Sequence, residues 1–113
     1  MMLKKFEQKV CPSFSVKIWL AGNIQSARLF CAQYFADVGL CATIIPAIYS
    51  YTGGEEEGFV IGLINYPRFP SDPISIQNKA IDLGEKLARY LGQGSFLIET
   101  PNEMIWFTRR EGD

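Results

Sequence analysis

The sequence contains no histidine. This absence excludes histidine as a general acid or base, excludes Ser–His and Cys–His nucleophile pairs, and removes a common zinc ligand. Cysteine is also scarce, since the chain has three, Cys11, Cys31 and Cys41. An odd number of cysteines without paired spacing argues against a disulfide framework. We therefore expect Cys31 and Cys41 to be small buried residues of a protein kept in a reducing compartment.

An excess of positive charge and long apolar segments are missing as well. The net charge is −1 at pH 7, whereas a nucleic-acid-binding domain needs a basic face that displaces the counterions of the phosphates. Residues 1–14 carry charges throughout, so they do not have the apolar centre of a signal peptide. No apolar run approaches the roughly 20 residues of a membrane span. These absences predict a cytoplasmic protein that binds neither nucleic acid nor membrane.

What is present is the pattern of one folded domain. The chain has 113 residues, of which 48% are apolar, and this is enough for one core. We expect a loosely ordered lead-in over residues 1–14 and a single domain over residues 15–113. Apolar residues at steps of three and four predict one helix between Asn23 and Gly39, and another that begins between residues 72 and 75 and ends at Gly92. Segments rich in β-branched and aromatic residues predict strands at residues 16–21, 40–48, 59–65, 95–99 and 104–108.

The order of these elements is strand, helix, strand, strand, helix, strand, followed by one more strand. This is the order of a ferredoxin-like plait, an α+β fold in which an antiparallel sheet carries both helices on one face. The other face of such a sheet alternates to polar residues when it meets water. Residues 59–64, however, carry no charge at positions of either parity. We therefore expect further copies of the chain to cover the second face in a homo-oligomer.

The most informative local feature is the run Tyr-Thr-Gly-Gly-Glu-Glu-Glu-Gly at residues 51–58, within a predicted loop over residues 49–58. One interpretation is a solvated hairpin tip. Another is a carboxylate held at the entrance of a strand to bind a cationic ligand, with glycines that let the ligand approach the backbone. A metal site is a weaker third interpretation, because neighbouring side chains of an extended segment point to opposite faces. The residue pattern alone leaves these alternatives open.

The element order, together with Glu56-Glu57 directly before the apolar residues 59–63, resembles the phage S-adenosylmethionine (SAM) lyases. These are small anti-restriction enzymes that were long called SAM hydrolases. The resemblance implies a homotrimer with the substrate between subunits, in the cytoplasm of the host cell. It also implies cleavage of SAM to methylthioadenosine and homoserine lactone without a metal or cofactor. Such a reaction needs no general base, so the missing histidines are no obstacle to it.

On this resemblance the acidic pair supplies the catalytic candidates, Glu57 first and Glu56 second. The surrounding residues supply the candidates for substrate binding, through aromatic faces, hydroxyl groups and open backbone: Tyr49, Tyr51, Gly53, Gly54 and Phe59. The alternative hypothesis is a non-enzymatic plait that binds a small molecule or inhibits a host protein through the same acidic surface.

Overall fold

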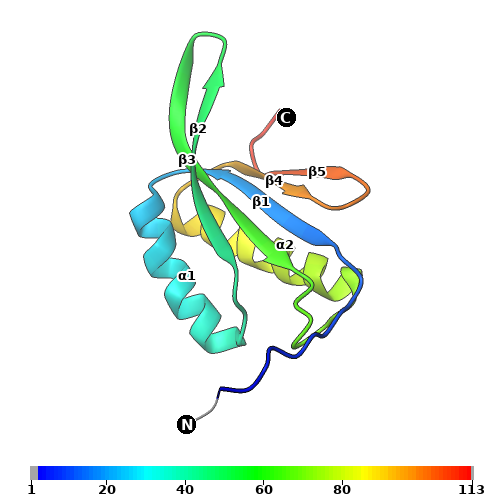
Figure 1. Ribbon diagram of the computed structural model, residues 1–113. Helices are drawn as coiled ribbons and strands as arrows, with labels where there is room; N and C mark the ends of the chain where they lie inside the picture. Colours follow the sequence, from blue (N-terminus) through cyan, green and yellow to red (C-terminus); the bar gives the residue numbers. More distant parts are fainter. Residues whose placement is uncertain (1–2, 113) are drawn as a thin grey trace.

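A computed structural model of the chain, which describes residues 3–112, contains one five-stranded sheet and two helices (Figure 1). The strand order is β2-β3-β1-β4-β5, and every neighbouring pair is antiparallel. This arrangement confirms the predicted ferredoxin-like plait, with β5 as the additional strand beside β4. In chain order the elements are β1 (Ser15–Ala21), α1 (Ile24–Val38), β2 (Thr43–Tyr51), β3 (Gly54–Ile64), α2 (Pro73–Tyr90), β4 (Ser95–Glu99) and β5 (Met104–Thr108).

The helices begin and end where the sequence places capping residues. The Asn23 side chain accepts a backbone N–H of the first turn of α1, and Gly39 ends this helix in the left-handed conformation, with φ of 66°. The Asp72 side chain caps α2 in the same way, and Pro73 is the first residue of that helix. Within residues 3–112, no helix is both long and apolar enough to cross a membrane.

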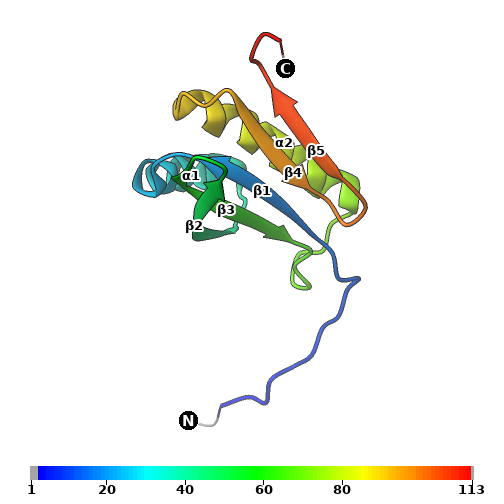
Figure 2. The ribbon, with the colours of Figure 1, turned by 90° about the horizontal axis from the view of Figure 1, so that it is seen from above.

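The core lies between the sheet and the two helices, which cover the same face (Figure 2). Five isoleucines, one from each strand, form a continuous cross-strand row on this face. Both helices direct their apolar stripes at it, and the buried polar side-chain atoms among the described residues all have hydrogen-bond partners. The row consists of Ile44, Ile61, Ile18, Ile98 and Ile105, and the helices add Ala27, Cys31, Tyr34, Ile76, Ala80, Leu83 and Leu87.

The opposite face of the sheet carries a second apolar row, which no helix covers. By register it consists of Ile45, Val60, Trp19, Leu97 and Trp106, again one residue from each strand. In the single chain Ile45 is 56% exposed and Trp106 is 51% exposed. The row is therefore apolar as the sequence indicates, while Lys17 and Glu99 pair beside it on the same face. That further copies of the chain cover it stays a prediction.

The prediction of a loop over residues 49–58 is wrong, because the two strands continue through it. Tyr51 pairs with Gly54 at the end of a regular hairpin, and the turn between them has Gly53 at φ of 92°. Antiparallel pairing already fixed in the sheet extends along both strands, so the low strand propensity of Gly and Glu does not interrupt it. Residues 48–57, the hairpin tip, lie beyond the end of β1 and stand out from the sheet (Figure 1).

Residues 3–14 contain neither a helix nor a strand and leave the body at the end opposite the hairpin tip (Figure 1). Asn65, which is 7% exposed, holds their last part: its side-chain amide donates to the Pro12 carbonyl at 2.8 Å. The two projections give a radius of gyration of 16.2 Å, against about 13 Å for a compact domain of this size. Residues 1 and 2 of the predicted lead-in and residue 113 of the predicted domain lie outside the described residues.

The structure separates the two cysteines that we expected in the core. Cys31 is buried on α1, and burial raises the pKa of its thiol to about 11, so this thiol is unreactive at neutral pH. Cys41 is exposed, which contradicts the expectation. The reason is that α1 ends at Val38 and β2 begins at Thr43, so Cys41 lies in the connection and not in a strand.

Candidate functional site

The acidic residues lie where the hairpin tip meets the sheet, beside the start of α1. Glu57 is the last residue of β3 before that strand pairs with β1. Its backbone carbonyl accepts the N–H of Gly22 at 3.0 Å, in the turn that leads from β1 into α1. The candidate site is therefore built by three elements that are distant in the sequence.

Strand alternation sends consecutive glutamates to opposite faces. Glu57 has the parity of the core residue Phe59, so it points to the helix side. There its carboxylate accepts the backbone N–H of Ile24, the first residue of α1, at 3.2 Å. A negative charge at this position is favoured by the partial positive charge of the helix N-terminus. Glu56 points to the other face, where it pairs across the hairpin with Tyr49.

Tyr49 ties this region to the sheet. Its hydroxyl donates to the Phe59 carbonyl at 2.5 Å and accepts the Leu20 N–H at 3.2 Å. Leu20 and Phe59 face each other in β1 and β3, so the hydroxyl bridges the two strands at the base of the hairpin tip. Burial raises the pKa of Tyr49, and the charge of Glu56 acts in the same direction, while the Leu20 hydrogen bond opposes both.

Gly58 makes the position of Tyr49 possible. A Cβ atom at residue 58 would lie 2.6 Å from the Leu20 carbonyl oxygen and would overlap the Tyr49 ring. Sequence reasoning singled out Gly53 and Gly54 as candidates and missed this role of Gly58. The available signal was an isolated glycine directly before an apolar strand segment, which indicates a close approach of neighbouring groups.

The structure brings some of the predicted site residues together and separates others. Glu56 and Tyr49 lie together on one face at the base of the hairpin tip, and Glu57 lies beside them in sequence but points to the helix side. Tyr51, Gly53 and Gly54 lie at its far end, where Tyr51 is 57% exposed. The side chain of Phe59 is fully buried in the core, so it contributes a backbone carbonyl to this region and no ring surface.

In one chain the two candidate glutamates lie on an open surface. A hollow of about 430 Å³ lies beside α1 and β2, and one of about 560 Å³ lies beside the start of β1 and the ends of β3 and β4, both within the roughly 300–1,000 Å³ of small-ligand pockets. A third hollow, of about 110 Å³, lies at the C-terminal end of α2. Neither Glu56 nor Glu57 lines any of the three. Within residues 3–112, no group of three cysteine or carboxylate side chains is placed to hold a metal ion. A ligand enclosed at the glutamates would need a second surface.

Comparison with known proteins identifies the fold. No protein-family model and no curated protein matches the sequence. Among solved structures, a phage SAM lyase in complex with S-methyl-5'-thioadenosine has a TM-score of 0.65 at 15% identity, covering 97% of this chain and 100% of that chain. A phage SAM lyase in the apo state has a TM-score of 0.67 at 15% identity, covering 96% and 100%. The resemblance drawn from the sequence is thus confirmed at the level of the fold.

Proposed function

We propose that this protein cleaves SAM to methylthioadenosine and homoserine lactone, in a homo-oligomer whose sites lie between subunits. The observation that supports this most is the similarity of fold to phage SAM lyases over nearly the whole of both chains. The bound product in one of them, a methylthioadenosine, fits the cleavage that the acidic pair suggested from the sequence. An anti-restriction role in the cytoplasm of a host cell belongs to the same proposal.

The reaction is an intramolecular displacement. A carboxylate oxygen of the methionine part of SAM attacks its own γ-carbon, a C–O bond forms, and the bond from this carbon to sulfur breaks. The electron pair of that bond goes to sulfur, which leaves as a neutral thioether, and no proton moves. Because opposite charges cancel along the path, a site shielded from water favours the transition state over the solvated substrate. The protein mainly holds the chain folded for attack.

The residues at the base of the hairpin tip can take specific roles in this proposal. Glu57 keeps acceptor capacity beyond its bond to Ile24, because a carboxylate has two oxygens. It would bind the ammonium or ribose hydroxyls of SAM, or face the sulfonium, with Glu56 as the second candidate. The hydroxyl of Tyr49 is engaged with the sheet, so Tyr49 would offer its ring beside Glu56, its partner across the hairpin. Tyr51 would offer an exposed ring to a cation, an interaction of about 0.5–2 kcal/mol.

The assembly part of the proposal is supported by the uncovered apolar row. Ile45, Val60 and Trp106 belong to a row that crosses all five strands, and large exposed apolar patches of this kind mark interfaces. A second subunit packed there would also supply a surface near Glu56 and Tyr49, whose side chains belong to this face. We expect a homotrimer, measured as mass by light scattering at micromolar concentration, and a stable monomer would contradict this.

The decisive experiment is incubation of the purified protein with SAM, with and without EDTA, followed by chromatography for methylthioadenosine. Turnover that persists in EDTA is the expected result. Running it in ¹⁸O-water separates the two routes, because water attack on the γ-carbon labels the homoserine hydroxyl at once. The lactone route gives unlabelled lactone first. No methylthioadenosine at all would favour the alternative, a binding or inhibitory module.

The role of the glutamates is tested by Glu57→Gln, which keeps the shape of the side chain and removes its charge. We expect most of the activity to be lost while the mass of the assembly is unchanged. Glu55→Gln is the matched control, since it removes a charge from the same strand two residues further out, and it should retain activity. Wild-type rates in both Glu57→Gln and Glu56→Gln would mean that the acidic run is a solvated surface.

A further inference from the structure

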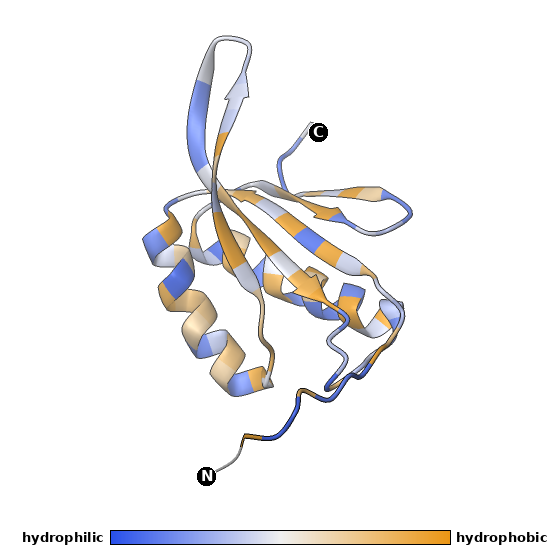
Figure 3. Ribbon diagram, viewed as in Figure 1, coloured by the Kyte–Doolittle hydropathy of each residue, from blue (hydrophilic) through white to orange (hydrophobic). Residues whose placement is uncertain are grey.

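The two projections of the molecule carry opposite charge. Residues 3–10, the N-terminal arm, hold Lys4, Lys5 and Lys9 against Glu7 and are therefore net +2. The hairpin tip holds three consecutive glutamates, Glu55 to Glu57, and no basic residue, so it is net −3. In Figure 3 the outer part of β3 and most of the arm are both coloured as hydrophilic, at opposite ends of the molecule. One chain thus carries two complementary surfaces that its own fold keeps apart.

Both projections also expose apolar side chains. In the arm, Leu3 is 90% exposed, Val10 is 80% exposed and Phe6 is fully exposed. In the hairpin tip, Ile48 is 62% exposed. A two-stranded hairpin without further cover is only marginally stable in water, and exposed large apolar residues on a charged segment are typical of a contact surface. Each projection can therefore be stabilised by a partner through both apolar contacts and ion pairs.

We propose that the N-terminal arm of one copy binds along the hairpin tip of a second copy. An extended arm of eight residues reaches about 26 Å, and the four residue pairs of the tip are about 13 Å long, so the arm can follow the whole tip. A contact between two different surfaces of the same chain is heterologous and closes into a ring when its rotation allows. The contact adds to the proposed packing of the sheet face, and it does not depend on SAM cleavage.

An anionic membrane is the other surface that a basic arm with apolar residues would suit. The charge of the rest of the chain favours a second copy. The whole chain is net −1 and the arm is net +2, so the remainder is net −3 and would be repelled by anionic lipids. The second copy presents its negative charge at the hairpin tip, where the arm can meet it.

Charge exchange tests the proposal. Lys4→Glu, Lys5→Glu and Lys9→Glu together reverse the arm, and Glu55→Lys with Glu56→Lys reverses most of the tip. Each variant alone should weaken self-association about tenfold, measured by sedimentation over a concentration series. Mixing the two variants should restore association in part, because two of the three arm-to-tip contacts of a mixed trimer then join surfaces of opposite charge. Restoration on mixing cannot come from a contact within one chain.

Deletion of residues 3–10 from the full chain should weaken association more, about a hundredfold, since the apolar contacts are lost too. The variant should keep the wild-type circular dichroism spectrum, because the deletion ends before Pro12. Unchanged association in this variant would overturn the proposal, as would a failure of the mixed variants to associate more tightly than either alone. Arm-dependent co-sedimentation of the protein with phosphatidylserine vesicles, without an effect on self-association, would overturn it in favour of a membrane.

Discussion

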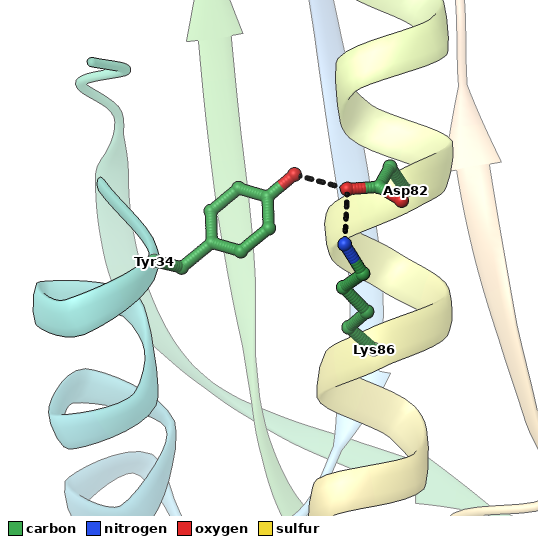
Figure 4. Close-up of polar contacts among 3 residues, drawn as sticks. All are labelled: Tyr34, Asp82 and Lys86. Carbon is green, nitrogen blue, oxygen red and sulfur yellow. Dashed lines mark hydrogen bonds and ion pairs between the residues drawn. The ribbon is translucent and has the colours of Figure 1, made fainter. Parts of the chain in front are cut away.

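The helix-covered half of the molecule and the hairpin tip are built on different principles. Under the helices, Ile18, Ile61 and Ile98 are fully buried, and α1 and α2 are joined by a polar network (Figure 4). The hairpin tip has four residue pairs that contact each other beyond the end of β1, and all of its residues except Ile48 to Tyr51 are glycine, glutamate or threonine. The first region holds the buried core of the fold, whereas the second exposes charge and the ring of Tyr51 on the surface.

The two regions meet at a small number of backbone contacts. Tyr49 bridges Leu20 and Phe59, and Glu57 joins the tip to the start of α1. Substitutions in the core, at the junction and in the tip should therefore have effects of decreasing size on stability. Among the variants that still fold, the effects on assembly and activity should run in the opposite order.

The largest effect is expected in the core row. Ile61→Asp places a carboxylate among fully buried isoleucines, which costs several kcal/mol and should unfold the domain. Ile45→Asp changes the other face of the sheet, where the side chain is 56% exposed. Ile45→Asp should leave the chain folded and lower the mass of the assembly. Circular dichroism and light scattering on the pair separate folding from assembly, and unfolding of Ile45→Asp would contradict the assignment of the two faces.

The next effect is expected at the junction. Gly58→Ala forces its new methyl group against the Leu20 carbonyl and the Tyr49 ring, so we expect a loss of about 1–3 kcal/mol in the free energy of unfolding. Gly62→Ala is the matched control in the same strand, where the new Cβ would meet the Thr43 hydroxyl at 2.8 Å. That hydroxyl can rotate away, so the loss should stay below about 1 kcal/mol. Urea titration measures the free energy of unfolding of both variants. Equal losses would mean that the contact of residue 58 with Tyr49 and Leu20 does not require glycine.

A smaller effect is expected from the network between the helices. The Tyr34 hydroxyl donates to Asp82 at 2.6 Å, and Lys86 approaches the same oxygen at 3.1 Å (Figure 4). The hydrogen bond from Tyr34 lowers the pKa of Asp82, with Lys86 as a further cause. Burial, and then Asp82, raise the pKa of Tyr34. Tyr34→Phe should cost about 0.5–1.5 kcal/mol at pH 7.

The same network predicts two pH windows. Because the pKa of Asp82 is lowered in the folded state, its contribution is present above the ordinary value of 3.8 and is lost as the pH falls below it. Because the pKa of Tyr34 is raised, its contribution is lost as the pH rises above its ordinary value of 10.0. Unfolding measured at pH 2–5 and 9–11 should be less pH-dependent in Tyr34→Phe. Tyr90→Phe, which keeps the ring contact with Phe30, should retain the wild-type profile.

The smallest effect on stability is expected at the start of α1. Glu57→Gln removes a charge from an exposed helix N-terminus, so the free energy of unfolding should fall by less than about 1 kcal/mol, and less still in high salt. Asn23→Ala removes the side-chain cap of the same helix and should cost about 1 kcal/mol. Thermal unfolding of each variant, followed by circular dichroism, measures these losses of stability. A much larger loss for Glu57→Gln would mean that its effect on activity reflects unfolding.

The sequence by itself determined the kind and order of the elements and the buried side of each helix. Asn23, Gly39 and Asp72 mark helix ends because a cap is a contact within one turn, and the apolar stripe of α2 follows from a period of 3.6 residues. Element order then indicated the plait, since few topologies fit two strand–helix–strand units with a short hairpin between them. The acidic pair could be recognised as a candidate site from its position directly before the apolar residues 59–63, through the resemblance to phage SAM lyases.

Only the tertiary structure decided how far the hairpin extends and what its residues contact. Glu57 meets Ile24, and Tyr49 meets Leu20, across 33 and 29 residues of sequence. Such pairings depend on strand register, which no local propensity encodes. A shift of one residue in the register would move every side chain of the strand to the other face of the sheet. The same holds for Cys41, whose exposure follows from where β2 begins. Local chemistry therefore fixed the parts of this protein, and the register of β1, β2 and β3 fixed which of its charges and rings lie together.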